Sequence, residues 1–281
     1  MRNKKRNTPV QVMKWIFLSI MVAFTLYPVI YALIGSLKTN FELTSGKAFF
    51  PEQWHLSNYA DAFTKGNFGL YTINSIIVAI TVTLLALVST SMAGYLLARH
   101  DFPGKKLIMG MYMAFMFIAL GSVTLFPIYV LLRALGLTNG LLGMSLAITG
   151  GQTSNVLLIM SFTKSIPKEL DEAAYIDGCS FFQVYCRIII HLIKPVLGVV
   201  ALFSFRLAWN NYLIPLVMSI GKPALRTLTV GVVQLKYSSN AAAEWHIMLA
   251  GASIALLPVL LVYLLANKQF IAGLTAGGVK G

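Results

Sequence analysis

Acidic side chains are scarce in this sequence, and four of the nine lie within one segment, residues 169–177. Three of them follow directly after Pro167, a residue that suits the first turn of a helix. Carboxylates are favourable at this positive end of a helix, and Gly178 can adopt the left-handed conformation that ends one. The segment 167–178 is therefore predicted to form a short amphipathic helix whose carboxylates can pair with a basic partner.

Arg206 is the one formal charge inside a predicted membrane span. An arginine at membrane depth is costly, so its side chain is expected to face protein or water. It either contacts a substrate, through sugar hydroxyls or an acidic group, or forms a structural pair with a partner subunit. The amide and aromatic residues that follow suit sugar recognition, although such aromatic residues also mark membrane interfaces; they are Trp209, Asn210, Asn211 and Tyr212.

Six small or polar residues, 150–155, interrupt another apolar segment. Such a break is tolerated where it faces protein or a water-filled cavity. Gln152 and Asn155 are therefore candidates for a substrate pathway, although helix packing explains the neighbouring glycines equally well.

Residues for catalysis or metal binding are not grouped in this sequence. The two cysteines and the four scattered histidines have no metal-ligand spacing. A phosphate-binding loop needs an earlier glycine and a hydroxyl residue around its Gly-Lys pair, and the three Gly-Lys pairs lack both; they begin at Gly46, Gly104 and Gly221. We therefore expect a non-catalytic chain with no cofactor of its own, which takes energy from a partner.

The elements that position these residues follow from the distribution of charge. The chain is 57% hydrophobic and 11% charged, whereas soluble domains have about 25% charged residues. A membrane-spanning helix needs roughly 20 mostly apolar residues, and six segments meet this requirement. They are residues 15–35, 71–97, 108–132, 143–163, 196–219 and 246–267.

Lysine and arginine predict the orientation of these spans, because basic residues concentrate in cytoplasmic loops. The two tails and the 99–106 and 164–194 loops together carry 14 lysines and arginines, whereas the loops on the opposite side carry seven. This bias places both termini in the cytoplasm. The net charge of +13 is thus assigned to loops and lipid contact, not to nucleic acid. The larger set comprises Arg2, Lys4, Lys5, Arg6, Lys14, Arg99, Lys105, Lys106, Lys164, Lys168, Arg187, Lys194, Lys268 and Lys280.

The predicted fold is an all-α, polytopic membrane protein with one transmembrane domain, residues 15–267. Cytoplasmic tails, 1–14 and 268–281, flank this domain. The longest cytoplasmic loop, 164–194, holds the acidic helix and a second helical stretch near 181–192.

Several motifs, in their order and spacing, give the chain a resemblance to a known family. In the acidic loop they are Glu172-Ala173-Ala174, Asp177-Gly178, Ile188 and Pro195; elsewhere they include Asn58-Tyr59, Asn74-Ser75, Ala93-Gly94-Tyr95, Trp209-Asn210 and the 273–281 tail. This set resembles the permease subunits of ATP-binding-cassette (ABC) importers, in particular the maltose-type, six-span carbohydrate permeases. The resemblance runs from about residue 20 to the end.

The resemblance implies a type I ABC importer permease fold and a sugar or oligosaccharide as substrate. It implies that the 167–178 helix inserts into a separate ATPase through Glu172, Ala173, Ala174, Asp177 and Gly178, with a second contact at Gly277 and Lys280. The implied partners are a second, non-identical permease, an ATPase dimer that binds ATP and magnesium, and an extracellular or periplasmic solute-binding protein. The implied location is a bacterial or archaeal cytoplasmic membrane.

Three other classes are weighed against this interpretation. An ion-coupled secondary transporter often has acids within the membrane and repeated halves, whereas all nine acids here lie in loops or at span ends. A membrane-embedded enzyme needs clustered histidine, aspartate or cysteine at membrane depth, whereas at that depth the predicted spans offer only Arg206 and amide side chains. An ABC permease for a non-sugar solute is the nearest alternative, disfavoured by the carbohydrate-type tail and the Trp-Asn motif.

Overall fold

The computed structural model describes residues 8–46, 48–118, 121–235 and 243–278. Within these ranges every regular element is a helix, as the sequence predicts. The chain divides into two compact units. Unit 1 comprises residues 1–68 and 232–256, and unit 2 comprises residues 69–231 and 257–281.

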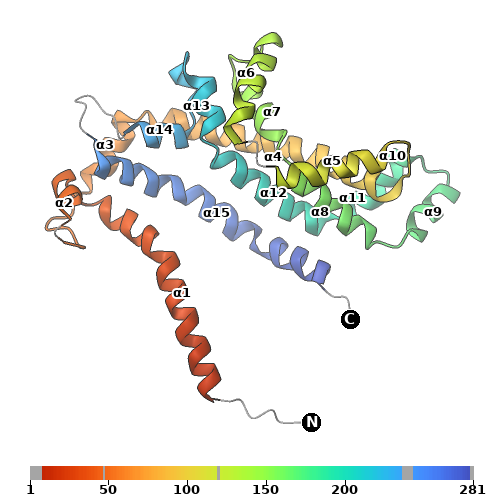
Figure 1. The fold of residues 1–281 in the computed structure, drawn as a ribbon, viewed down its shortest axis with the longest axis horizontal. Helices are drawn as coiled ribbons and strands as arrows, with labels where there is room; N and C mark the ends of the chain where they lie inside the picture. Colours follow the sequence, from red (N-terminus) through yellow and green to blue (C-terminus); the bar gives the residue numbers. More distant parts are fainter. Residues whose placement is uncertain (1–7, 47, 119–120, 236–242, 279–281) are drawn as a thin grey trace. The chain divides into compact units, whose positions relative to one another are not determined.

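Unit 1 contains α1, two short helices and the first part of α15 (Figure 1). α1 carries apolar side chains on every side, and the most hydrophobic part of the segment from Gln11 to Gly35 contains no buried residue. A helix that is apolar all round belongs in a membrane. The bounds are α1 Thr8–Gly35, α2 Asn40–Ser45, α3 Ser57–Lys65 and, for the whole of its length, α15 Trp245–Gly278.

Polar side chains hold the turns of unit 1. The Asn58 amide donates to the backbone carbonyls of Ser36 and Lys38, at 2.8 and 2.9 Å. These bonds join α3 to the end of α1, so buried carbonyls that would lack partners are satisfied. The Asn40 amide donates to the Ala243 carbonyl at 2.9 Å, and its oxygen accepts from the Trp245 N–H. α2 is thereby tied to the start of α15.

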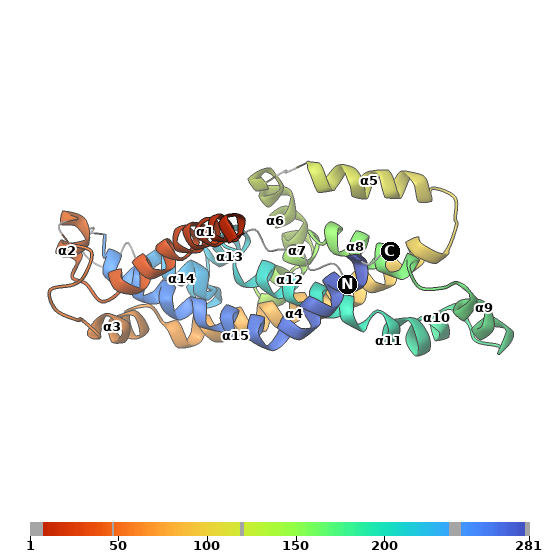
Figure 2. The ribbon, with the colours of Figure 1, turned by 90° about the horizontal axis from the view of Figure 1, so that it is seen from below.

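Unit 2 holds the long helix α4 and a series of shorter helices. α9 to α11 lie at the opposite end of this unit from α13 and α14 in both views (Figures 1 and 2). The bounds are α4 Phe68–Arg99, α5 Lys105–Phe117, η1 Gly121–Thr124, α6 Leu125–Ala134, α7 Leu141–Thr149, α8 Thr153–Lys164, α9 Glu169–Ile176, α10 Phe181–Val184, η2 Tyr185–Ile189, α11 Ile190–Leu192, α12 Lys194–Trp209, α13 Leu213–Ser219, η3 Pro223–Leu225 and α14 Leu228–Leu235.

The core of unit 2 packs the loop helices against α4 and α8. Tyr95 of α4 is buried and stacks on Phe181 of α10, with ring centroids 4.9 Å apart. The hydroxyls of Ser91 and Tyr185 share a hydrogen bond of 2.7 Å, which joins α4 to the π-helical segment η2. The loop helices thus pack into the body of unit 2.

Gly94 of α4 is required by close packing against α8. A Cβ atom at this position would lie 2.7 Å from Cγ2 of Ile159 and 3.1 Å from the Met160 nitrogen. Only glycine allows the two backbones to approach this closely. The packing role accounts for the glycine in the Ala93-Gly94-Tyr95 motif.

Three described helices are long and apolar enough to cross a membrane, and a bent pair raises this number to four. The three are residues 11–35, 68–99 and 245–264, and the pair is 181–192 with 194–209, bent by 82°. The other expected spans are divided: 108–132 among α5, η1 and α6, 143–163 between α7 and α8, and 196–219 between α12 and α13. The count of six therefore remains a prediction.

Two helices extend from the expected spans into the predicted tails. α1 begins at Thr8, seven residues before the predicted start at residue 15, and α15 continues to Gly278, into the predicted C-terminal tail. The α15 extension meets no helix-ending proline, because residues 265–278 contain none, and the helix passes through its glycines. The α1 extension places Pro9 in the first turn, where proline is tolerated. The expected tails are thus partly helical.

Candidate functional site

α9 forms the acidic loop helix, and it is shorter than predicted. It spans Glu169–Ile176, so it begins two residues after Pro167, with its acids in the first turn as expected. Gly178 ends it with a φ of 83°, the left-handed conformation predicted for this residue. In this closing turn the Gly178 N–H donates to the Tyr175 carbonyl, and the Cys179 N–H donates to the Ala174 carbonyl.

The predicted coupling residues fall on two faces of α9. Ala174 is buried in the core of unit 2, against the cluster that contains Tyr95 and Ile189. Glu172 and Ala173 are exposed, as are Asp177 and Gly178 in the closing turn. Ile176 is 87% exposed and adds an apolar contact to this outer face. The helix therefore presents mixed apolar and acidic chemistry outward, with Ala174 as its anchor.

A buried ion pair fixes α9 to α4. The Arg99 Nε and the Asp171 Oδ2 lie 2.6 Å apart, and their side chains are 5% and 8% exposed. The Arg99 Nη2 also donates to the Ile166 carbonyl at 2.9 Å. Burial raises the pKa of the Asp171 carboxyl, and the Arg99 guanidinium opposes that rise. Arg99 therefore holds both the entry to α9 and its first turn.

The helices after α9 form the predicted second stretch, 181–192, in three short segments. Ser180 and Gln183 form a capping box at the start of α10. The path then bends by 82° between Leu192 and Lys194 before α12 begins. This bend separates the loop helices from the apolar helix that carries Arg206.

Gln152 and Asn155 lie together in a buried polar network at the start of α8. The Asn155 amide donates to the Gln152 side-chain oxygen and, at 3.2 Å, to the Ser204 hydroxyl of α12. The Ser204 hydroxyl donates to the same Gln152 oxygen at 3.2 Å. The Gln152 Nε2 is buried and has no hydrogen-bond partner among the described residues. The network joins α8 to α12 and leaves the Gln152 Nε2 as a buried donor without a described partner.

Arg206 lines a surface pocket at the junction of α12 and α13. The pocket has a volume of about 320 Å³. The side chain of Trp209 is buried instead, and its backbone carbonyl accepts from the Thr229 hydroxyl at 2.7 Å. The pocket thus brings together four of the five predicted residues on this segment. Its lining residues are Arg206, Leu207, Asn210, Asn211, Tyr212 and Leu213.

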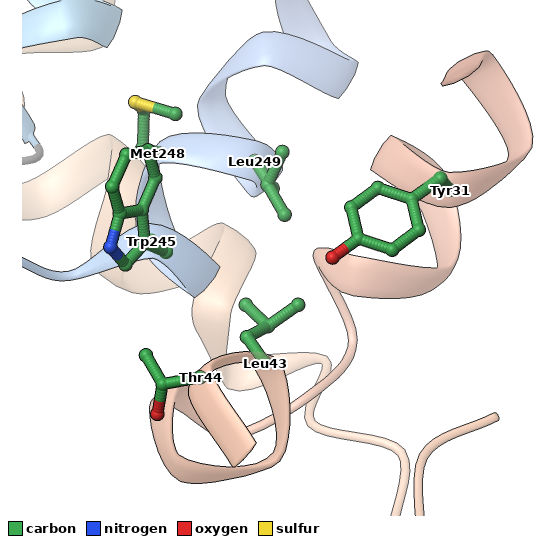
Figure 3. Close-up of a pocket in the computed structure, with 6 residues that line it drawn as sticks. All are labelled: Tyr31, Leu43, Thr44, Trp245, Met248 and Leu249. Carbon is green, nitrogen blue, oxygen red and sulfur yellow. The ribbon is translucent and has the colours of Figure 1, made fainter. Parts of the chain in front are cut away.

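Unit 1 has a pocket of its own, which sequence analysis did not identify. Figure 3 shows the Tyr31 hydroxyl and the side chains of Leu43 and Leu249 directed toward the same space, of about 400 Å³. Thr44, Trp245 and Met248 complete the lining, which contains no charged side chain. An apolar and aromatic hollow where α1 ends and α15 begins fits the edge of a membrane better than a reaction centre.

The C-terminal residues of the predicted ATPase contact are only partly covered. Gly277 is the penultimate residue of α15, and Lys280 lies outside the described residues. In the described part of the chain, no group of three histidine, cysteine or acidic residues is arranged to hold a metal ion.

Two partners in these sites were not predicted as functional residues. Asp171 was assigned only to the helix N-terminus, but it lies three residues before Ala174 and shares its buried face. That spacing is the signal that marks Asp171 as needing a basic partner. Ser204 has no comparable signal, because a lone serine in an apolar helix is common and usually bonds its own backbone.

Long apolar helices, an amphipathic loop helix and polar groups at helix breaks define a polytopic membrane protein with a structured loop. The sequence matches the model of one family over residues 90–270, described as "Binding-protein-dependent transport system inner membrane component". The chain belongs to this family, as its resemblance to importer permeases led us to expect.

Relatives along nearly the whole chain agree with this assignment. The sulfoquinovosyl glycerol transport system permease protein SmoH of Agrobacterium fabrum is 33% identical over 96% of this chain and 94% of its own length. The trehalose transport system permease protein SugB of Mycobacterium tuberculosis is 32% identical over 94% and 95%. The arabinooligosaccharides transport system permease protein AraQ of Bacillus subtilis is 30% identical over 95% and 94%.

The fold is also that of a solved importer. A chain in the crystal structure of a bacterial ABC transporter involved in the import of the acidic polysaccharide alginate superimposes with a TM-score of 0.76. The match covers 96% of this chain and 99% of that chain at 20% identity. This similarity supports the predicted all-α permease fold.

Proposed function

We propose that this chain is the membrane permease subunit of an ABC importer that carries a sugar or oligosaccharide into the cytoplasm. The observation that carries the proposal is family membership together with saccharide permease relatives that align along the whole chain. The chain itself performs no catalysis. ATP is hydrolysed on a separate subunit, which also binds the nucleotide and its magnesium ion.

The proposed assembly contains a second, non-identical permease, an ATPase dimer and a solute-binding protein outside the cell. The chain crosses the cytoplasmic membrane of a bacterium or archaeon six times, within residues 15–267, and both termini lie in the cytoplasm. The basic residues of the loops support this orientation. Nucleic acid has no part in the function.

α9 is the proposed link to the ATPase. Its outer face combines an acidic side chain with small and apolar ones, which a cleft on a partner can enclose. These exposed residues are Glu172, Ala173 and Ile176. Asp177 and Gly178 shape the closing turn, and Ala174 anchors the helix to unit 2. Closure of the ATPase dimer then moves the loop as a rigid body and switches the bundle between inward-open and outward-open states. Gly277 and Lys280 provide a second contact with the ATPase.

The substrate pathway is proposed to include the pocket at the α12–α13 junction and the polar network of α8. Asn210, Asn211 and Tyr212 offer amide and hydroxyl groups for sugar hydroxyls. Gln152 and Asn155 are assigned to the path through α8, where the buried Gln152 Nε2 has no hydrogen-bond partner among the described residues. Trp209 supports the pocket from within the unit.

Uptake of labelled saccharides into cells tests this function. We expect uptake only when the partner ATPase is co-expressed, and we expect a protonophore to leave the initial rate unchanged while cellular ATP is maintained. An ATPase variant that cannot hydrolyse ATP is the matched control and abolishes uptake. Uptake that is independent of the ATPase and collapses with the proton gradient would identify a secondary transporter instead.

A further inference from the structure

We propose that the pocket at the α12–α13 junction binds an anionic group, a carboxylate or sulfonate, carried by an acidic saccharide. This inference rests on the proposed function and narrows its substrate class. The group that carries it is the Arg206 guanidinium, which is exposed and lines the pocket with Asn210 and Tyr212.

The depth of Arg206 makes its charge significant. It lies 12 residues after Lys194, the first residue of α12, which is about 18 Å along a helix at 1.5 Å per residue. This places the charge near the middle of the predicted span 196–219, which the structure breaks after Trp209, so that Arg206 lies in the last turn of α12. A bare cation at membrane depth is unfavourable and needs water or a counter-charge. A surface arginine at a span end would carry no such requirement.

The described part of the chain supplies no counter-charge for Arg206. Its three ion pairs use Lys65, Arg99 and Lys105 as the bases. The acids of unit 2 lie in the 101 and 169–177 segments, at the α9 end of the unit and away from α13 (Figures 1 and 2). Any anion that pairs with Arg206 therefore comes from another molecule.

The neighbours of Arg206 offer hydrogen-bond donors suited to a sugar that carries an anion. Asn210 lies four residues after Arg206, so the two side chains share one face of the chain. The Asn211 side-chain oxygen accepts from the Ile214 N–H at 3.2 Å, which leaves the amide nitrogen as a donor. A guanidinium binds a carboxylate or sulfonate through two parallel hydrogen bonds, while the amides and the Tyr212 hydroxyl can bind ring hydroxyls.

A carboxylate on the partner permease is the competing counter-charge. The names of the relatives cover several saccharides, and it is the charge of Arg206 and its polar neighbours that favour an anionic one. The two sources differ in consequence. A permanent partner acid makes Arg206 important for assembly with every substrate, whereas a substrate anion makes it important only for acidic saccharides.

The test uses the whole importer, purified through a tag on this chain and reconstituted in liposomes with its binding protein and internal ATP. Matched saccharides serve as probes: trigalacturonate against maltotriose, and sulfoquinovose against glucose. We expect at least one acidic probe to be taken up more than tenfold faster than its neutral counterpart. Arg206→Gln should lower that uptake at least tenfold, and Arg206→Lys should retain part of it because the positive charge remains.

Arg133→Gln is the matched control, since Arg133 is an exposed base at the end of α6 and lies outside the pocket; it should behave as wild type. The proposal is overturned if the wild-type complex takes up only neutral probes. It is also overturned if Arg206→Gln lowers neutral and acidic uptake equally or prevents assembly, the outcome for a partner acid. Absence of ATP-dependent uptake of every saccharide would refute the proposed function itself, a result distinct from uptake of neutral probes alone.

Discussion

At the scale of single residues, the ion pair of Arg99 and Asp171 does the most to position the candidate coupling helix. Both side chains are nearly fully buried, and Arg99 also binds the carbonyl that precedes the helix. A buried pair adds little net stability relative to an apolar pair, but removal of one partner leaves an uncompensated charge. The pair therefore acts chiefly by fixing the position of α9 against α4, and adds little net stability to unit 2.

Arg99→Leu should destabilise unit 2 by about 3 kcal/mol, because Asp171 is left buried without its base. The double variant Arg99→Leu/Asp171→Leu should recover most of this loss. Thermal unfolding of the purified complex in detergent measures both effects. Asp101→Asn is the control: its ion pair with Lys105 is 97% exposed on the acid side, so a change below about 1 kcal/mol is expected. Equal destabilisation by Arg99→Leu and Asp101→Asn would contradict the assigned role of the Arg99–Asp171 pair.

At the scale of elements, the close contact of α4 with α8 depends on Gly94. The Ile159 side chain occupies the space that a Cβ at this position would need. Both helices carry residues of the candidate sites, since Arg99 ends α4 and Asn155 lies in α8. A change in their separation would therefore reach both sites.

Gly94→Val should lower the free energy of unfolding by about 1–3 kcal/mol, the usual cost of overpacking a core. Gly69→Ala on the same helix is the matched control, because outside the adjoining helix backbone no atom of the described residues lies within 4 Å of a Cβ placed there. It should be neutral or should stabilise the chain by about 0.5–1 kcal/mol through helix propensity. Thermal unfolding and uptake assays check the pair of variants. Wild-type stability of Gly94→Val would show that the two helices can separate without cost.

The sequence was informative where local signals decide the structure. The acids and Gly178 predicted α9 and its left-handed end, and the 150–155 segment predicted the break between α7 and α8. The break at 210–212, within the predicted fifth span, was not foreseen, because apolar residues on both sides give one continuous hydropathy signal. The pairing of Arg99 with Asp171 was also missed, since contact between residues this far apart in the chain depends on tertiary packing rather than on local pattern.

At the scale of the whole molecule, family membership and fold identify a permease, and the distribution of its charges suggests how it works. The bases mark the predicted cytoplasmic face, and the acids of α9 mark the proposed contact with the ATPase on that face. Among the described residues Arg206 forms no ion pair, and it lies within the predicted fifth span, where it is proposed to face the substrate. In this account energy enters at α9 and transport occurs among the helices of the membrane domain.

Coupled measurement of ATP hydrolysis and saccharide uptake in proteoliposomes tests this account most directly, with two variants of Gly178. Apart from its two chain neighbours, no atom of the described residues lies within 4 Å of a Cβ at this position, and its φ is 83°. Gly178→Asn should keep most of the uptake, because asparagine tolerates the left-handed conformation. Gly178→Arg should leave the chain folded in the membrane but lower uptake more than tenfold and remove the stimulation of ATP hydrolysis by substrate. Wild-type uptake in Gly178→Arg would contradict coupling through α9.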